Sequence, residues 1–218
     1  MALLEFHNVS FINEGRYILK GINADIEADD FISIIGPSGS GKSTFLRLCS
    51  NLISPSEGEI MYKGKNVEEY EPTELRREIV YCSQTPYLFG DTVAENIYFP
   101  FTIRGMKPDK EKIDAMFSMF HMSSDYLSRD VRNLSGGERQ RIALIRSLLF
   151  KPEVLLLDEI TSALDAENAK TVEDVIVSFS KKGTTILWVT HNAEQSRKYA
   201  NKLFKIENGQ LTSVEVIK

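Results

Sequence analysis

The sequence predicts an α/β fold with a parallel sheet, because strand patterns alternate with helix patterns along the chain. Three apolar runs, at 31–35, 154–157 and 185–189, are continuous rather than alternating. Continuous runs of this kind are typical of parallel strands that are covered on both faces. Between the last two runs, apolar residues recur at i, i+3, i+4 and i+7 over 172–179, which predicts a buried helix face.

Short antiparallel strands are expected near both ends of the chain. The first 30 residues and the stretch 59–66 have the brief apolar segments of such strands. Near the C-terminus, Asn208 and Gly209 lie between two short apolar segments, which is a hairpin signal. These regions predict an antiparallel β portion beside the parallel sheet.

The stretch from about 85 to 134 predicts a small helical lobe inserted in the α/β core. Within it, apolar residues over 113–120 repeat the spacing of one helix face, and Pro108 suits the first turn of that helix. No internal repeat, low-complexity tract or flexible linker interrupts the sequence. We therefore expect one domain over 1–218, with the lobe as an insertion.

The composition is that of an ordinary globular protein. The 218 residues are 42% hydrophobic and 26% charged, with 26 Lys and Arg against 31 Asp and Glu, a formal net charge of −5. These values exclude collagen-like, disordered and disulfide-scaffold proteins. Because the net charge is negative and the sequence has no stripe of basic residues, no nucleic acid partner is expected. The apolar runs are far shorter than the roughly 20 residues that span a bilayer. The N-terminus lacks a secretory signal, and Cys49 and Cys82 lack metal-ligand spacing, so a cytoplasmic location is expected.

A glycine-rich loop between the first predicted strand and a helix expected over 43–51 predicts a phosphate site. Residues 36–43 read GPSGSGKS and fit the pattern G-x-x-x-x-G-K-[ST]. In this pattern backbone N–H groups and the helix dipole surround phosphate oxygens, Lys42 adds a full charge, and the Ser43 hydroxyl ligates Mg²⁺. The alternative is a turn that only joins a strand to a helix. The expected nucleotide-binding residues are Gly36, Pro37, Ser38, Gly39, Ser40, Gly41, Lys42, Ser43 and Thr44.

Two acids at the end of the second predicted strand supply further chemistry for such a site. Asp158 and Glu159 directly follow the run VLLL. Adjacent strand residues point to opposite faces, so we expect the two acids to have different tasks. Asp158 is assigned to Mg²⁺, and Glu159 is assigned as the general base that positions the attacking water. The alternative is a pair of solvated acids where a strand meets a loop.

A further predicted helix begins with two adjacent glycines, which are unusual at that position. Residues 134–141 read LSGGERQR, and the helix is expected to continue to about Phe150. Ser135 and Glu138 have the spacing of a capping box. Two glycines just inside a helix lower its stability, which indicates that another group approaches the backbone closely. LSGGERQR resembles the signature motif of ATP-binding cassette (ABC) ATPases, whose other motifs occur here in the expected order.

The resemblance covers residues 3–211 and implies a P-loop NTPase fold of the ABC ATPase type, with ATP and Mg²⁺ as cofactors. Gln84 resembles the Q-loop glutamine that reaches Mg²⁺. Asp165 ends a segment that resembles the D-loop of the dimer, and His191 resembles the switch histidine that contacts the γ-phosphate. The implied catalytic residues are Lys42, Glu159 and His191.

In ABC ATPases two cassettes pack head to tail, which implies an ATP-dependent homodimer here. The signature residues of one cassette would cover the ATP held by the other; they are Ser135, Gly136, Gly137 and Glu138. A helix N-terminus with a serine donor is suited to this clamp. The family's adenine-stacking aromatic corresponds to Asn13 here, so that contact passes to Tyr17 or Phe11, or is weak.

Some stretches resemble one group within the family. Residues 83–101, 158–165 and 187–192, with Ile160 where proline is common, resemble the ATP-binding subunits of FetA-type iron-export ABC transporters. This resemblance implies metal efflux through a separately encoded integral membrane permease, and a peripheral place on the inner face of the cell membrane. Aromatic residues over 87–101 are then a groove for a helix of the permease or the core of the lobe, and we expect some rings in each.

Other function classes fit less well. A guanine-binding N-K-x-D motif is absent, the spacing between Gln84 and Leu134 leaves no room for the long coiled coil of DNA-repair ABC ATPases, and translation-factor ABC proteins carry two cassettes. Two alternatives stay open. One is an importer or exporter of another solute, and the other is a non-transport ABC ATPase that acts as a nucleotide-dependent interaction protein.

Overall fold

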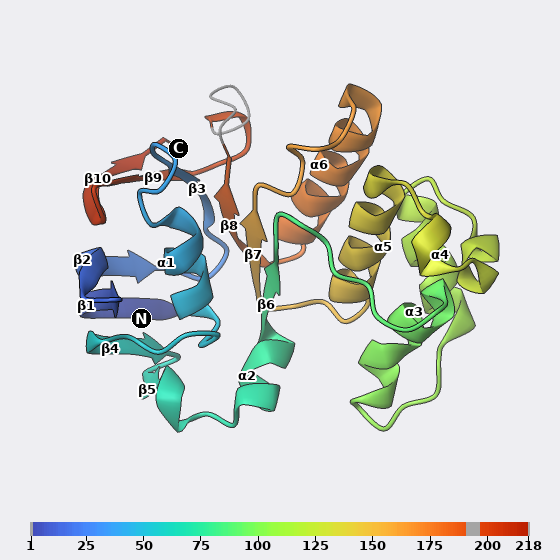
Figure 1. Ribbon diagram of the computed structural model, residues 1–218, viewed down its shortest axis with the longest axis horizontal. Coiled ribbons are helices and arrows are strands. Elements are labelled where there is room, and N and C mark those ends of the chain that lie inside the picture. Colours follow the sequence, from blue (N-terminus) through green and yellow to red (C-terminus); the bar gives the residue numbers. More distant parts are fainter. Residues whose placement is uncertain (1, 191–196, 218) are drawn as a thin grey trace. The chain divides into compact units, whose positions relative to one another are not determined.

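The computed structural model describes residues 2–190 and 197–217, and the chain forms two compact units (Figure 1). Unit 1 combines three stretches: Met1–Tyr81, Glu153–Glu159 and Gly183–Lys218. Unit 2 combines two: Cys82–Pro152 and Ile160–Lys182. Within the described residues, none of the helices has the length and apolar character that crossing a bilayer requires.

A six-stranded sheet forms the centre of the α/β part. Its strands in spatial order are β10 (Gln210–Val216), β9 (Lys202–Glu207), β3 (Phe31–Ile35), β8 (Thr185–Val189), β7 (Val154–Asp158) and β6 (Ile79–Cys82). Strand β3 pairs in parallel with β8 and β9, and β7 pairs in parallel with β8. Every residue of β7 and β8 is buried, as continuous apolar runs in a parallel sheet require. The parallel α/β core predicted from the sequence is confirmed.

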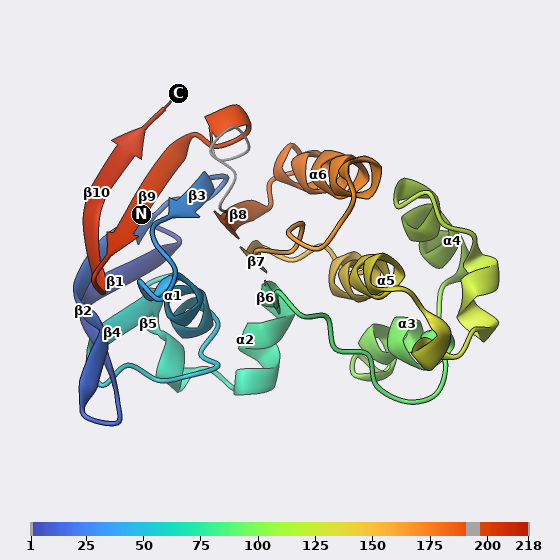
Figure 2. The same cartoon turned by 45° about the horizontal axis from the view of Figure 1, so that its top comes forward.

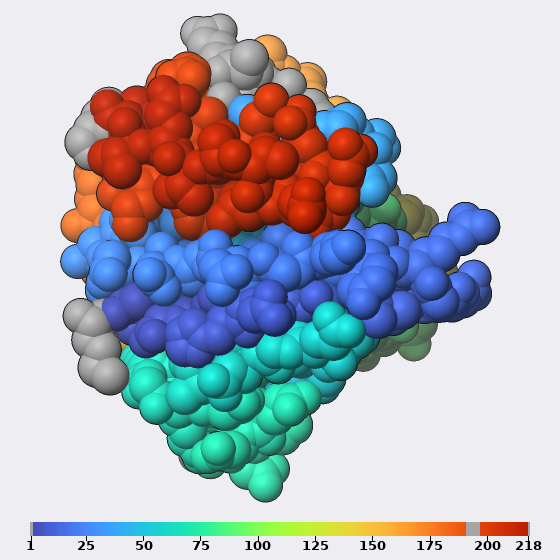
Figure 3. Space-filling model, turned by 90° about the vertical axis from the view of Figure 1, so that its left-hand side faces the viewer, coloured from blue at the N-terminus to red at the C-terminus, as the bar shows by residue number. Residues whose placement is uncertain are grey.

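A second, antiparallel sheet completes unit 1. Its strands in order are β2 (Arg16–Ile26), β1 (Leu4–Asn13), β4 (Glu57–Tyr62) and β5 (Lys65–Asn66). Figure 3 shows β1 and β2 (blue) between β4 (cyan) and the β9–β10 hairpin (red). The Lys20 N–H in β2 donates to the Gly209 carbonyl in that hairpin at 2.8 Å. The antiparallel portion and the hairpin at Asn208 and Gly209 are therefore confirmed.

Helix α1 (Lys42–Cys49) lies between the two sheets of unit 1 (Figure 1). The ring of Phe45 in α1 stacks on Phe6 of β1 with centroids 4.7 Å apart, and it meets Phe204 of β9 edge-on at 6.4 Å. All three rings are buried, and burial of each contributes roughly 1.5–3 kcal/mol. This packing fixes α1, and with it the loop that precedes α1, between the sheets.

Unit 2 is helical. Its main helices are α3 (Val93–Thr102), α4 (Lys110–Met119), α5 (Gly136–Leu148) and α6 (Ala166–Ser180), and its 3₁₀ turns are η2 (Ser124–Ser128) and η3 (Val131–Asn133). Figures 1 and 2 show α5 between α3 and α6. The apolar positions that predicted the two helix faces are buried: Ile113, Met116, Phe117, Phe120, Val172, Val175, Ile176 and Phe179. A helical part is present as predicted, but it is larger than the predicted lobe of about 85–134, because α5 and α6 belong to the same unit.

Some local expectations differ from the structure. The 3₁₀ turn η1 (Val67–Glu69), helix α2 (Pro72–Glu78) and strand β6 were not expected. Pro108 does not lie in the first turn of α4, because the Asp109 side chain caps that helix by accepting the Lys112 N–H at 3.1 Å. The helix therefore begins two residues after the proline. Helix α1 ends at Cys49, short of the predicted Asn51.

Both cysteines, Cys49 and Cys82, are free and buried. Burial raises the pKa of the Cys49 thiol far above its usual range and raises the pKa of Cys82 to about 11. Neither thiol is therefore ionised at neutral pH.

Candidate nucleotide-binding site

The loop between β3 and α1, residues 36–41, lies tightly against its neighbours in unit 1. Gly36 has a φ of 149° and Gly41 a φ of 103°. A Cβ atom on Gly36 would lie 1.9 Å from the Ile206 carbonyl oxygen, and one on Gly41 would lie 2.6 Å from Leu19 Cδ2. Both positions therefore require glycine for space as well as for conformation. The middle of the loop, residues 37–39, is exposed to solvent.

The N-terminus of α1 differs from those of the main helices of unit 2. Helices α3 to α6 each have an N-cap side chain that accepts a backbone hydrogen bond: Thr92, Asp109, Ser135 and Asp165. Helix α1 begins after Gly41, has no side-chain cap, and has no acidic residue in its first turn. The first N–H groups of a helix have no intrahelical partner and carry partial positive charge. This end of α1 is therefore suited to a phosphate anion.

Two side chains add hydrogen-bond donors to this helix end. Lys42 is 5% exposed, and its Nζ donates to the carbonyls of Gly36 at 3.0 Å and Pro37 at 2.8 Å. An ammonium group has three donors, so the loop uses two of them. The buried Ser40 Oγ has no hydrogen-bond partner among the described residues. Buried hydroxyls are normally paired, so Ser40 also offers the site a donor that the loop does not use.

Ser43 and Asp158 meet although they are far apart in the sequence. Ser43 Oγ donates to Asp158 Oδ1 at 3.0 Å, and the Tyr81 hydroxyl donates to Asp158 Oδ2 at 2.8 Å. Burial raises the pKa of Tyr81 to about 12; the Arg47 guanidinium opposes this shift, and Asp158 adds to it. The phenol is therefore a donor at neutral pH. Sequence reasoning assigned Ser43 and Asp158 to one site but did not find Tyr81.

Glu159 does not lie on the strand, as the sequence interpretation assumed. Strand β7 ends at Asp158, and Glu159 has a φ of 50°, in the left-handed region. Its N–H donates to the Val189 carbonyl at 3.1 Å. The two acids therefore do not alternate along one strand, as was expected, because the backbone leaves the strand between them. Such conformations cost about 1–3 kcal/mol and cluster at functional sites.

The predicted signature residues begin α5 in unit 2. The capping box is present: Ser135 Oγ accepts the Glu138 N–H at 3.2 Å, and Glu138 Oε2 accepts the Ser135 N–H at 2.7 Å. The Tyr126 hydroxyl, followed by the Ser135 N–H, lowers the pKa of Glu138 to about 2. A Cβ atom on Gly136 would have no neighbouring atom within 4 Å. A Cβ atom on Gly137 would lie 3.5 Å from Leu164 Cδ2, which is an ordinary van der Waals contact. Neither glycine is therefore needed for packing within the described chain.

The other predicted site residues lie in different surroundings. Gln84 is exposed in unit 2. Asp165, also in unit 2, caps α6 by accepting the Asn168 N–H at 2.8 Å, and this bond lowers its pKa. His191 lies outside the described residues.

The two candidates for adenine stacking differ in exposure. Phe11 packs against the hydrophobic core of unit 1 and is half-buried. Tyr17 is 48% exposed, and its hydroxyl donates to Glu57 Oε1 at 3.1 Å. The chain next to Tyr17 also approaches the loop, since a Cβ on Gly41 would lie 2.9 Å from the Ile18 carbonyl oxygen. Tyr17 therefore has the more accessible ring.

Known proteins resemble this chain in sequence and in fold. The sequence model described as "ABC transporter" matches residues 19–162. The "Probable iron export ATP-binding protein FetA" of Escherichia coli K12 is 41% identical over 206 residues, which cover 94% of this chain and 91% of FetA. This chain belongs to the ABC transporter family. It is an ATP-binding, ATP-hydrolysing subunit with the P-loop NTPase fold of that family.

Two further ABC proteins are informative. The "Lipoprotein-releasing system ATP-binding protein LolD" of Aquifex aeolicus is 38% identical over 199 residues, which cover 88% of each chain. The solved structure "Dimeric structure of a post-hydrolysis state of the ATP-binding cassette MJ0796 bound to ADP and Pi" superposes with a TM-score of 0.88 at 27% identity and covers 99% of each chain.

The aromatic-rich stretch of this ABC ATPase divides between core and surface. Phe101 is fully buried, whereas Tyr87 is 73% exposed and Phe99 is 43% exposed. Phe89 meets the Phe99 ring edge-on at 5.1 Å. The core interpretation therefore holds for Phe101, whereas Tyr87 and Phe99 lie at the surface.

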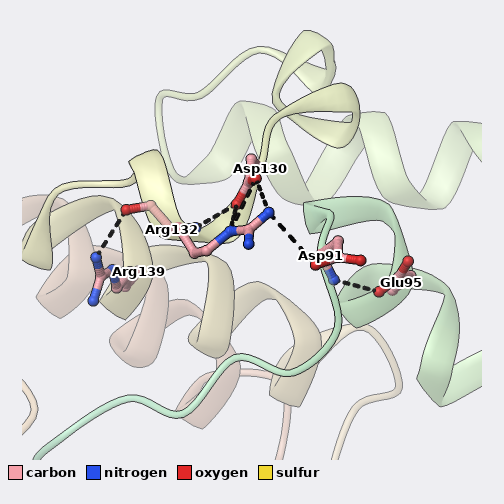
Figure 4. Close-up of polar contacts among 5 residues, drawn as sticks. All are labelled: Asp91, Glu95, Asp130, Arg132 and Arg139. Atoms are coloured by element: carbon pink, nitrogen blue, oxygen red, sulfur yellow. Dashed lines mark hydrogen bonds and ion pairs between the residues drawn. The ribbon is translucent and has the colours of Figure 1, made fainter.

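A pocket of about 290 Å³ lies beside this stretch in unit 2. Its lining residues are Pro86, Tyr87, Leu88, Val131, Arg132 and Arg139. Figure 4 shows the polar contacts there: Arg132 donates to both oxygens of Asp130 and lies 3.6 Å from Asp91 Oδ1. Arg139, within the signature motif, donates to the carbonyls of Arg132 and of Leu134, the first residue of that motif.

Proposed function

We propose that this ABC subunit binds Mg-ATP at the N-terminus of α1, hydrolyses it in a head-to-tail homodimer, and drives metal export through an integral membrane permease. The observation that carries the nucleotide site is the uncapped start of α1, which has the buried Lys42 ammonium and the unpaired Ser40 hydroxyl beside it. Three kinds of donor converge there, and each favours a polyphosphate.

The donors beside α1 also fit a magnesium ion. Ser43 and Asp158 present a hydroxyl and a carboxylate at hydrogen-bond distance, and Mg²⁺ prefers such oxygen ligands together with phosphate oxygens and waters. When bound, the ion neutralises charge on the β and γ phosphates. Glu159 then orients the attacking water and accepts its proton, while Lys42 holds the phosphate oxygens. Gln84 and His191 are proposed as a further Mg²⁺ contact and as the γ-phosphate switch.

We propose that the partner subunit completes each nucleotide site with its signature residues. The solved MJ0796 cassette that this chain resembles is dimeric, which supports a homodimer here. Gly136 supports it independently, because the space beside its backbone is open within the described chain. A phosphate can therefore approach the N-terminus of α5 next to Ser135. Asp165 of the D-loop is proposed to lie at the same dimer contact.

Gly136→Ala tests this arrangement. The added methyl group meets nothing within the described chain, so thermal stability should be unchanged or raised, by at most about 1 kcal/mol. ATPase activity should fall on the order of 10- to 100-fold, because the methyl group displaces the partner's phosphate from the helix end. Thermal melting and steady-state ATPase assays measure both effects, and a stable variant with full activity would contradict the proposed clamp.

A face of unit 2 is proposed as the contact with the permease. In unit 2, whose residues are all described, the exposed large apolar side chains lie within one stretch: Tyr87, Tyr98, Phe99, Ile103 and Met106. Exposed aromatic side chains beside a pocket are typical of protein interfaces. Bound there, the subunit would lie peripherally on the cytoplasmic face of the membrane.

Iron is the solute that the sequence similarity favours. FetA, at 41% identity, is named for iron export, and the stretches 83–101 and 158–165 resemble that type. LolD, at 38% identity, belongs to a lipoprotein-releasing system, so transport of another solute is the second candidate.

Deletion of the gene in its own organism tests the iron assignment. Loss of an exit route should raise cellular iron and lower survival in peroxide, and elemental analysis with a peroxide challenge measures both. A Glu159→Gln copy is the matched control and should not restore either property, because it lacks turnover. If iron, manganese and zinc contents all stay unchanged, metal export is refuted and transport of another solute is preferred.

A further inference from the structure

Tyr81 donates one of two hydrogen bonds that converge on Asp158 at the proposed metal site in unit 1. From α1, Ser43 donates to one oxygen of Asp158, and from β6 the Tyr81 hydroxyl donates to the other oxygen at 2.8 Å. Arg47 follows Ser43 by one helical turn, so both lie on one face of α1, and the Arg47 guanidinium lies near the Tyr81 phenol. The two hydrogen bonds on Asp158 thus connect α1, β7 and β6.

These contacts restrict how the Asp158 carboxylate can turn. Asp158 is 4% exposed, so few other donors can reach it. A carboxylate with one hydroxyl donor can rotate about its Cβ–Cγ bond, whereas donors to both oxygens fix its plane. Tyr81 therefore holds Oδ2 and leaves Oδ1 directed at Ser43 Oγ.

We propose that Tyr81 is a positioning residue that holds the Asp158 carboxylate in the orientation required for the divalent cation of the nucleotide complex. The role rests on the proposed Mg-ATP site and adds a residue to it. Partners that orient metal-binding side chains typically contribute 10- to 100-fold to metal affinity.

A purely structural role for Tyr81 is the competing explanation, since its ring also packs against the hydrophobic core of unit 1. Tyr62 allows the two roles to be separated. Its hydroxyl also donates to a carboxylate, Glu78 Oε2 at 2.7 Å, and its ring is more deeply buried than that of Tyr81. Glu78 has no part in the proposed nucleotide site, so Tyr62→Phe is the matched control.

Tyr81→Phe removes the hydroxyl and keeps the ring. The probe is Mn²⁺ with a non-hydrolysable ATP analogue, and free Mn²⁺ is measured by electron paramagnetic resonance. Tyr81→Phe should weaken Mn²⁺ binding to the protein–nucleotide complex about 10-fold. Binding of the same analogue in EDTA should be unchanged, because the phosphate donors on the loop and on α1 remain.

The control variant and the unmodified chain make each outcome decisive. Tyr62→Phe should retain wild-type Mn²⁺ affinity. If both variants weaken Mn²⁺ binding equally, or if Tyr81→Phe weakens metal-free nucleotide binding as much, the positioning role is overturned in favour of a structural one. If the unmodified chain shows no Mn²⁺–nucleotide binding, the proposed nucleotide site itself fails, and the role of Tyr81 fails with it.

Discussion

Replacing Glu159 with glutamine is expected to preserve ATP binding and to slow turnover by about 10²- to 10⁴-fold, the range for loss of a general base. The amide keeps the shape of the side chain, and the Ser43–Asp158 pair is untouched. Hydrolysis would then no longer reopen the proposed dimer, so the variant should elute as a dimer with Mg-ATP in gel filtration. Wild type without nucleotide should elute mainly as a monomer.

Glu14→Gln is the matched control for this experiment. Glu14 is also a glutamate with a φ of 50°, but it is exposed in the turn between β1 and β2. The control reproduces the same chemical change in the same backbone conformation, and its ATPase activity should equal that of wild type. Near-normal turnover in Glu159→Gln would remove Glu159 from the role of base and leave His191 as the candidate.

Replacing Lys42 with alanine is expected to weaken ATP binding by about 100-fold or more, since each charged hydrogen bond contributes roughly 1.5–3 kcal/mol. The change removes the ammonium group from the start of α1, where it donates to Gly36 and Pro37 in the loop. Isothermal titration calorimetry with Mg-ATP measures the loss of affinity.

The Lys42→Ala experiment needs a control for charge and one for folding. Lys65→Ala removes one exposed positive charge from β5 in the same unit and should bind ATP normally. Thermal melting of Lys42→Ala shows whether the protein still folds without the hydrogen bonds from Lys42 to the loop carbonyls. A folded Lys42→Ala variant that binds Mg-ATP tightly would refute the loop as the phosphate site.

The parts of the fold that were predictable are those with a long or distinctive pattern. The strands at 31–35 and 185–189 have the predicted bounds, because continuous apolar runs are specific to buried parallel strands. Strand β6 has four residues and α2 has seven, too few for a period to show. Both short elements were therefore missed.

The same contrast applies to the site. Ser43 and Asp158 are 115 positions apart, but each belongs to a motif whose chemistry requires the other. Tyr81 and Asp158 are 77 positions apart, and no motif connects a tyrosine in a short strand to a carboxylate. Glu159 was assigned by its chemistry, but its left-handed backbone could not be predicted, because glutamate has no preference for that region.

The burial of both cysteines makes this chain convenient for site-specific labelling. Cys49 and Cys82 are the only cysteines in the sequence, and burial keeps both thiols protonated at neutral pH and poorly reactive towards maleimides. A cysteine introduced at an exposed position such as Thr85 would therefore react first. Fluorophores or spin labels can thus be attached to such a single-cysteine substitution without first removing Cys49 or Cys82.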